Sequence, residues 1–349
     1  MPINPNCITV LTVTYGHRAH LVTETIARAA AAGVHDFVVV LNGSHPDSRL
    51  AIQTLAERHN LRVQYVCNPR NIGSAPGFAA GIVEARRLNS NHVLILDDDN
   101  WLDPTSLVGY LRALDSALDT QPDVMIAGYH SANGPQHEVS HGVPIRRAYP
   151  LCIPGRFEGF DLIDRLKEKL GRKSLGVSVP PCTAISIPVA PYGGLLMSRG
   201  AINKAIDPNR ELVLYHDDYD FTRRHVESGT SLMLETSIKI NDADGKEAIS
   251  TQRQHYMSKL FTTPVEEEWR LLYRLRNAAY TNWRLATKER VPARFIMNYT
   301  VRIVAFAIFA VRHRNLGLYA RIITATVSGI RGKLGETYKL PDAVYSTND

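Results

Sequence analysis

Three observations predict an α/β fold for this chain, with a mostly parallel, twisted sheet, helices on both faces, and a C-terminal helical region. Over residues 1–130, short apolar runs alternate with longer segments of helical composition. This alternation favours parallel strands joined by helices that cover both faces of the sheet. Acidic residues directly follow a strand-like run, as they do at the ligand-binding edge of open α/β sheets. From residue 266 to about 335 the composition is helical almost throughout.

The expected strands are short and rich in Val, Leu and Ile, which is typical of strands buried on both faces. They cover Ile8–Thr14, Asp36–Leu41, Val63–Cys67, His92–Leu96 and Val124–Tyr129, with further strand character at Pro191–Ser198 and an edge strand at Ser231–Ile240. The expected helices cover His20–Ala32, His45–Asn60 and Gly77–Leu88, and Tyr215–Gly229 combines an acidic motif with a basic helix.

Bulk composition sets broad limits on partners and compartment. The chain is 44% hydrophobic and 21% charged, which is ordinary for a globular protein, and its net charge of +6 favours anionic partners. The four cysteines lack a CxxC spacing, so we expect neither a zinc site nor disulfides, and a reducing cytoplasm fits. We expect no signal peptide, and the longest uninterrupted apolar run, Ile303 to Val311, is too short to span a bilayer.

The triplet Asp97-Asp98-Asp99 follows the expected buried strand His92–Leu96. Carboxylates packed so closely repel one another and need a compensating cation. Because carboxylates are hard oxygen ligands, Mg²⁺ or Mn²⁺ is the natural candidate, and such an ion could hold a diphosphate. The alternative interpretation is an acidic loop or a helix N-terminus.

A second acidic cluster, Asp217 to Asp220, lies about 120 residues further along the chain. One of two adjacent carboxylates can hold a substrate hydroxyl while the other removes its proton as a general base. The alternative is a plain helix start, because acidic residues there and arginines later in the helix suit the helix dipole.

These motifs and four others together resemble the family 2 inverting glycosyltransferases of the GT-A fold, and in particular bacterial rhamnosyl- and galactofuranosyltransferases. The resemblance extends from residue 8 to about 335, with the motifs in the family's order. They are Val13-Thr14-Tyr15 with Arg18; Val40 to Ser44, with Leu41 where Asp is common; Asn68 to Gly81, which contains N-x-G-x-x-x-G-x-x-x-G; Leu96 to Asp99, similar to the DxD motif; Asp217 to Phe221, similar to E-D-x-D-[FL]; and Tyr273 to Asn277, similar to Y-x-x-R-N.

The resemblance implies roles for these residues. Asp97 and Asp99 would hold the Mn²⁺ or Mg²⁺ that grips the donor diphosphate. Asp218 would be the general base, and Asp217 would orient the acceptor. The residues implied in donor binding are Thr14, Tyr15, Arg18, Asn42, Asn71, Gly73 and Asp98, and those on the acceptor side are Tyr273, Arg276 and Asn277.

One departure from the family concerns the third metal ligand. Many relatives have a histidine after the edge strand that follows the base, and this chain has Asp242 there. Asp242 would be the third ligand, and Asp244 and His255 are rivals. The alternative is a plain turn, since Asn-Asp and Asp-Gly are common turn pairs.

The resemblance also implies a domain plan. Residues 1–265 would form the GT-A catalytic domain, with a nucleotide-sugar half (1–130) and an acceptor half (131–265) that carries an insertion at about 155–191. Residues 266–349 would form the C-terminal helical region. Between residues 288 and 333 it has nine basic residues and a single acid, Glu289. Such a region can lie on an anionic membrane surface, here the inner face of the cytoplasmic membrane, or pack on the catalytic domain or form a homo-oligomer contact.

The function implied is transfer of a sugar from a nucleotide-sugar donor to a hydroxyl of a cell-surface polysaccharide or lipid-linked glycan. UDP-galactofuranose and dTDP-rhamnose are the favoured donors. One alternative is a sugar-nucleotide pyrophosphorylase, although the glycine-rich, basic N-terminal signature of that class is missing. Another is a non-catalytic nucleotide- or membrane-binding module. The chain has no GxxxxGK[ST] and no common nucleic-acid motif, so we expect neither a P-loop NTPase nor a nucleic-acid partner.

Overall fold

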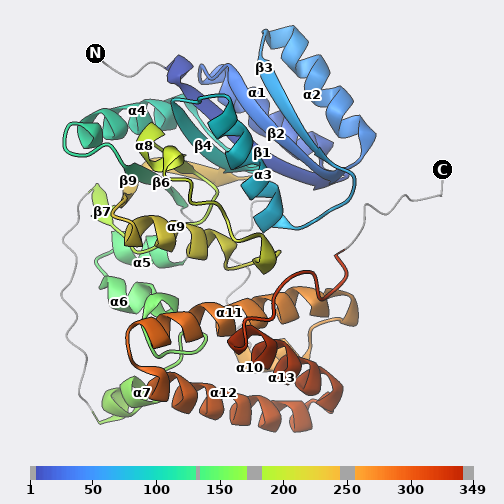
Figure 1. Cartoon of the computed structure of the whole chain (residues 1–349), viewed down its shortest axis with the longest axis vertical. Helices are drawn as coiled ribbons and strands as arrows, with labels where there is room; N and C mark the ends of the chain where they lie inside the picture. Colours follow the sequence, from blue (N-terminus) through green and yellow to red (C-terminus); the bar gives the residue numbers. More distant parts are fainter. Residues whose placement is uncertain (1–4, 131–133, 171–182, 244–255, 341–349) are drawn as a thin grey trace.

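The structure is a computed structural model that describes residues 5–130, 134–170, 183–243 and 256–340. Within these residues nine strands form one twisted sheet with helices on both faces, and a further group of helices packs below it in the view of Figure 1. The strands are β1 (Ile8–Gly16), β2 (Asp36–Ser44), β3 (Arg62–Asn68), β4 (His92–Asp97), β5 (Asn100–Trp101), β6 (Val124–His130), β7 (Ala184–Ser186), β8 (Leu195–Met197) and β9 (Ser231–Asp242).

The helices alternate with these strands in the first part of the chain and then follow one another. Before the C-terminal part they are α1 (Ala19–Ala31), α2 (Pro46–His59), α3 (Ser74–Arg87), α4 (Pro104–Leu118), α5 (Pro135–Ser140), α6 (Ile145–Ala148), α7 (Leu162–Lys169), α8 (Arg199–Asn203) and α9 (Asp217–Glu227). The C-terminal part contains α10 (Tyr256–Phe261), α11 (Glu268–Lys288), α12 (Pro292–Arg312) and α13 (Leu316–Ile330). Helix α7 lies beside α12.

The strand order is β3-β2-β1-β4-β8-β6-β9-β5, with β7 paired to β9. β1 is parallel to β2 and β4, and β6 is parallel to β9, whereas β8 is antiparallel to both of its neighbours. The long parallel strands therefore point the same way, and their carboxyl ends meet at one edge of the sheet. Asp97, His130 and Asp242 are the last residues of β4, β6 and β9 at that edge.

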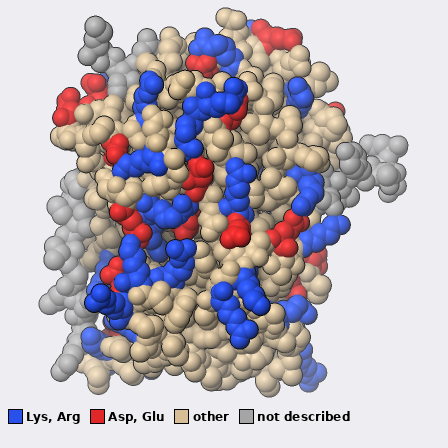
Figure 2. Space-filling model, in the orientation of Figure 1, with Lys and Arg blue, Asp and Glu red and all other residues tan. Residues whose placement is uncertain are grey.

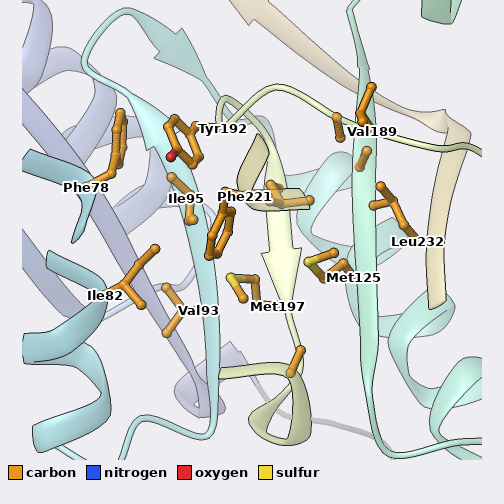
Figure 3. Close-up of a cluster of buried hydrophobic side chains, with 14 of the residues drawn as sticks. Phe78, Ile82, Val93, Ile95, Met125, Val189, Tyr192, Met197, Phe221 and Leu232 are labelled. Carbon is orange, nitrogen blue, oxygen red and sulfur yellow. The ribbon is translucent and has the colours of Figure 1, made fainter. Parts of the chain in front are cut away.

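Alternate residues of each strand enter two different apolar cores, as the period of two in a strand requires. On one face, α3 and α9 pack on the sheet through Phe78, Ile82 and Phe221, as Figure 3 shows. On the other face, α1, α2 and α4 pack against the side chains that point the opposite way, such as Leu94 and Leu96 of β4. The sheet is thus covered on both sides, which leaves its carboxyl edge as the accessible place for a ligand.

The C-terminal helices have an apolar core of their own, which includes Phe295 and Phe306 of α12. Phe157 from the expected insertion at 155–191 is buried in the same core, so the first part of that insertion packs on the C-terminal helices, whereas its last part, which contains β7, joins the sheet. Helix α12 has 21 residues with a mean hydropathy of 1.5, which is enough by length and composition to cross a membrane. The unbroken apolar run Ile303 to Val311 is shorter than the helix because Arg302 interrupts the apolar sequence without ending α12.

The predicted fold class is confirmed, including the C-terminal helical region. One expectation about the sheet is wrong: β9 is not an edge strand. It pairs with β6 on one side and with the short strands β7 and β5 on the other. Both short strands come from distant segments with little strand character of their own, so the pairing is tertiary rather than local.

Candidate active site

A cavity of about 370 Å³ opens at the carboxyl edge of the sheet; carboxylates of the first acidic cluster line it, whereas the second cluster reaches it only through Tyr219. Asp97, Asp99 and Asp242 line it from the strand side, and Tyr219, next to Asp218, lines it from α9. A second cavity of about 270 Å³, bordered by Tyr149, shares Tyr219 with the first. A larger groove of about 670 Å³ between α4 and β9 contains neither acidic cluster.

Asp97 lies at the floor of the first cavity. Its backbone N–H donates to Asn100 Oδ1 at 3.1 Å, which fixes the turn after β4. A Cβ on Gly193 would come within 2.9 Å of Asp97 Oδ2 and 2.1 Å of Asn100 Oδ1, so this close approach needs a glycine. Burial, and then the charges of Asp99 and Asp98, raise the pKa of Asp97 to about 7. Such crowded carboxylates favour a bound cation.

Asp98 points away from the cavity and is almost fully buried. Arg18 binds both of its carboxylate oxygens at 2.8 Å, and Thr14 Oγ1 donates to Asp98 Oδ2 at 2.8 Å. The expectation that Asp98 and Thr14 contact the donor is therefore not supported: Thr14 is fully buried, and both residues hold Arg18 in place. Arg18 also reaches Asp99 Oδ2 at 3.0 Å, and its guanidinium lies 5.2 Å from the ring centre of the half-exposed Tyr15. Arg18 and Tyr15 remain at the accessible surface beside the triplet.

Asp242 is positioned by two neighbours that the sequence did not single out. Asn100 Nδ2 donates to Asp242 Oδ1 at 2.7 Å, and His130 Nδ1 lies 3.5 Å from the same oxygen. Burial alone would lower the pKa of His130. The hydrogen bonds of its ring to Asp242 and to the Gly193 carbonyl favour the protonated form more strongly, so the pKa of His130 is raised. His130 follows a predicted strand, and this position at the carboxyl edge was its only sequence signal.

The carboxylates around the cavity suit a hard divalent cation, since Asp97, Asp99 and Asp242 offer oxygen ligands to one space. Among the described residues, no three acidic, histidine or cysteine side chains converge closely enough to form a preassembled metal site. Asp99 is paired with Arg18, so that pairing would have to loosen for Asp99 to bind an ion, whereas the amide of Asn100 binds one oxygen of Asp242 and orients this carboxylate. The rivals Asp244 and His255 lie outside the described residues.

Asp217 and Asp218 open helix α9, where the free backbone N–H groups favour acidic side chains. Asp217 is buried, and Ser74 Oγ donates to its Oδ2 at 3.1 Å. Burial raises the pKa of Asp217 to about 6. Burial and the charge of Asp217 raise the pKa of Asp218 well above its usual value, and the charge of Asp97 acts in the same direction. A carboxylate with a raised pKa is a stronger base, as general-base chemistry near neutral pH requires.

The loop after β3 joins the expected donor residues to the acidic pair. Asn42 is buried and donates to Asn71 Oδ1 and to the Gly73 carbonyl, both at 3.1 Å. Gly73 has a φ of 96°, and a Cβ there would meet the Val213 carbonyl at 2.2 Å. Asn42 therefore stabilises the conformation of this loop by hydrogen bonds and does not face a donor. The loop packs at Gly73 against Val213, in the segment that leads to Asp217.

The three residues expected on the acceptor side, Tyr273, Arg276 and Asn277, are fully buried on α11. The guanidinium of Arg276 donates to the carbonyls of Leu212 and Gly335, and the Tyr273 hydroxyl donates to the Tyr338 carbonyl. These side chains therefore do not face an acceptor. They bind backbone carbonyls of the loop before α9 and of the chain after α13.

The comparisons with known proteins agree with this geometry. Residues 9–182, about half of the chain, match the family model for glycosyl transferase family 2. The chain belongs to this family. The assignment, together with the strand order, agrees with the GT-A fold and the glycosyltransferase activity that the motifs predicted, and it removes the pyrophosphorylase and the non-catalytic module as alternatives. None of the curated proteins matches the sequence.

Solved structures with a similar arrangement are distant from this glycosyltransferase. The mannosyltransferase PcManGT from Pyrobaculum calidifontis, in complex with GDP-Man and Mn²⁺, is 16% identical, with 95% of this chain and 89% of that chain covered and a TM-score of 0.48. S. aureus TarS 1-349 in complex with UDP is 15% identical, with 96% and 94% covered and a TM-score of 0.48. GalNAc-T7 with UDP, GalNAc and Mn²⁺ is 10% identical, with 92% and 57% covered and a TM-score of 0.47. Likeness at this level assigns no substrate to the chain.

Proposed function

We propose that this glycosyltransferase is a metal-dependent, inverting enzyme that uses Asp218 as its general base. The observation that carries the proposal is that Asp97, Asp99 and Asp242 line the same cavity as Tyr219, which directly follows Asp218 in α9. Burial, and then the charge of Asp217, raise the pKa of Asp218, and the charge of Asp97, 121 positions earlier in the sequence, acts in the same direction. A metal-binding edge with a base close beside it is what transfer from a nucleotide-sugar requires.

In the proposed step, Asp218 takes the proton of an acceptor hydroxyl as that oxygen attacks the anomeric carbon. The new C–O bond forms while the bond from the anomeric carbon to the diphosphate oxygen breaks, so the nucleoside diphosphate leaves with the electron pair. Attack opposite to the leaving group inverts the anomeric configuration. Asp217, held by Ser74, would orient the acceptor, and Tyr219 stands between the two cavities.

Asp97, Asp99 and Asp242 are the residues that would hold Mg²⁺ or Mn²⁺. When bound, the ion would supply positive charge against the diphosphate leaving group. Arg18 and Tyr15 would line the nucleotide side, because both are accessible beside the triplet. UDP-galactofuranose and dTDP-rhamnose remain the favoured donors, on the resemblance of the Y-x-x-R-N motif.

The acceptor would be a cell-surface polysaccharide or a lipid-linked glycan, and the 270 Å³ cavity is our candidate for its entry. This cavity meets the first one at Tyr219 and is bordered by Glu138, Arg147 and Tyr149. The Tyr149 hydroxyl is buried and has no hydrogen-bond partner among the described residues.

Donor hydrolysis by the purified protein tests the proposal. The panel would contain UDP-galactofuranose, dTDP-rhamnose, GDP-mannose and UDP-GalNAc, each with Mn²⁺, Mg²⁺ or EDTA. We expect metal-dependent release of nucleoside diphosphate from one donor, lost in Asp99→Ala and in Asp218→Asn. Release that persists in EDTA would remove the metal from the proposal, and full activity of Asp218→Asn would remove the base.

A further inference from the structure

Helix α12 exposes an apolar face that no other described element covers. Ile296, Val304, Ile308 and Val311 recur at helical spacing on one side of the helix, and more than half of each residue is exposed. Leu316, at the start of α13, continues this surface and is also more than half exposed. We call these five residues the α12 face.

The opposite side of α12 is fixed to the rest of the protein. Phe295 and Phe306 are buried in the C-terminal core. Asn298 Nδ2 donates to the Gly155 carbonyl at 2.8 Å, and Arg294 Nε pairs with Asp161 at 2.7 Å. Although α12 is long and apolar enough to span a bilayer, these polar contacts hold it flat against the protein. A helix held in this way can lie in the plane of a membrane surface but cannot cross it.

Basic residues flank the α12 face at both ends. Arg290 precedes α12, Arg312 is its last residue and Arg314 follows it; all three are exposed and none forms an ion pair with a described residue. The sequence has no Asp or Glu between Glu289 and Glu336. Figure 2 shows Lys and Arg side chains and tan, uncharged surface over the lower part of the molecule, where the C-terminal helices lie.

We propose that the α12 face lies on an anionic phospholipid surface, with the helix axis parallel to the membrane. The apolar side chains would enter the boundary between headgroups and acyl chains, and Arg290, Arg312 and Arg314 would pair with lipid phosphates. The charges favour a membrane over a second copy of the chain, because two such faces packed together would bring basic residues together without acids to pair with them. The inference is independent of the proposed reaction.

Flotation of the full-length protein with vesicles tests this inference. The vesicles would be phosphatidylcholine alone or phosphatidylcholine mixed with phosphatidylglycerol. We expect binding to the anionic vesicles that weakens as salt rises, and little binding to the neutral ones. The double variant Val304→Asp with Ile308→Asp should bind at least about tenfold more weakly, since two exposed aliphatic side chains that would enter the lipid are replaced by charges.

The matched control is Leu50→Asp, which alters an equally exposed apolar residue on α2 and should bind vesicles like the unaltered protein. Donor hydrolysis should be the same in all variants, which separates this test from that of the reaction. Equal vesicle binding by the double variant would overturn the inference. So would an unaltered protein that ignores both vesicles but sediments as a dimer that the double variant disrupts, because the face would then join two copies.

Discussion

Asn277, buried on α11, donates its side-chain amide to the carbonyl of Tyr215 at 3.0 Å, two residues before Asp217. The same amide donates to the carbonyls of Leu212 and Leu214, both at 2.8 Å. The loop that it holds is strained, because Val213, Tyr215 and His216 all have φ between 63° and 66°, a region that side chains with a Cβ rarely adopt. Helix α11 therefore fixes the backbone of the loop that leads to Asp217 and Asp218.

We expect Asn277→Ala to lower kcat for donor hydrolysis by about tenfold or more, because a base displaced by a fraction of an ångström loses much of its effect. The loss of the two N–H donors that these three buried carbonyls share should also lower the free energy of unfolding by about 2–3 kcal/mol. The affinity for the nucleotide should change little, since Asn277 does not line the cavity at the triplet. Steady-state kinetics and nucleotide titration measure the two effects separately.

Asn298→Ala is the matched control for this variant. Asn298 is another fully buried asparagine whose amide holds backbone, at Gly155, but that backbone is not part of the site. Asn298→Ala should lose stability and keep kcat. If Asn277→Ala also kept kcat at an equal loss of stability, α11 would have no role in positioning the base.

The sequence was informative about strands and about charge, and uninformative about where polar side chains point. The run His92–Leu96 predicted a buried strand and an acidic edge because apolar periodicity and like-charge repulsion are local properties. Asp98 turned out to face Arg18 because consecutive residues of a tight turn diverge, and no pattern records which of them points inward. Arg276 and Asn277 were expected at a surface, since polar residues usually are, whereas here backbone carbonyls compensate their burial.

Two features were missed for different reasons. His130 belongs to no motif, and only the pairing of β6 with β9 brings it beside Asp242. Helix α4, in contrast, carries a clear local signal: Asp103 caps it by accepting from the Ser106 N–H at 2.8 Å, and Pro104 follows at the first helical position. The first could not be predicted without tertiary contacts, and the second could.

The ion pair between Arg18 and Asp98 should contribute strongly to stability. Arg18→Met would leave a buried carboxylate uncompensated, so we expect the free energy of unfolding to fall by about 2–3 kcal/mol at pH 7, somewhat less than for a fully buried pair because Arg18 is partly exposed. Arg62→Met, which breaks the exposed pair with Asp36, should cost much less stability, because solvent screens that pair. Urea unfolding of the two variants measures the two losses. Equal losses in the free energy of unfolding would show that the Asp98 carboxylate is solvated and does not depend on its ion pair with Arg18.

The raised pKa values of the acidic pair predict an acid limb in the rate at an unusually high pH. Because Asp218 must be deprotonated to act as a base, kcat should fall as the pH drops through its raised pKa, well above the usual aspartate range. The pH–rate profile of donor hydrolysis measures this limb. A rate that stays constant down to about pH 4 would exclude Asp218 as the group that titrates.

The raised pKa of Asp217 predicts that its ionised carboxylate lowers the stability of the folded protein. Its pKa in the folded protein is about 6, above the ordinary value of 3.8, so the folded state is favoured when Asp217 is protonated. Its contribution to stability is therefore fully present below about pH 4 and is lost as the pH rises through about 6. Asp217→Asn removes that loss and should stabilise the protein by on the order of 2 kcal/mol at pH 8, with a smaller gain at pH 5. Urea unfolding of Asp217→Asn and of the unaltered protein at pH 8 and pH 5 measures this difference. If the variant were less stable at pH 8, the neighbours of Asp217 would stabilise its ionised carboxylate.

Gly193 tests whether the backbone approach to Asp97 matters for the metal edge. In Gly193→Ala the new methyl would lie within 2.1 Å of Asn100 Oδ1, and Asn100 is the residue that holds both the Asp97 N–H and Asp242 Oδ1. Displacing Asn100 should separate the candidate ligands, so we expect the Mn²⁺ concentration for half-maximal donor hydrolysis to rise by about tenfold or more. Gly317→Ala, on the first turn of α13, meets only the flexible end of Arg321 at 3.6 Å and should leave the metal dependence unchanged. An unchanged Mn²⁺ requirement in Gly193→Ala, in a folded protein, would mean that Asn100 does not organise the carboxylates that bind the ion.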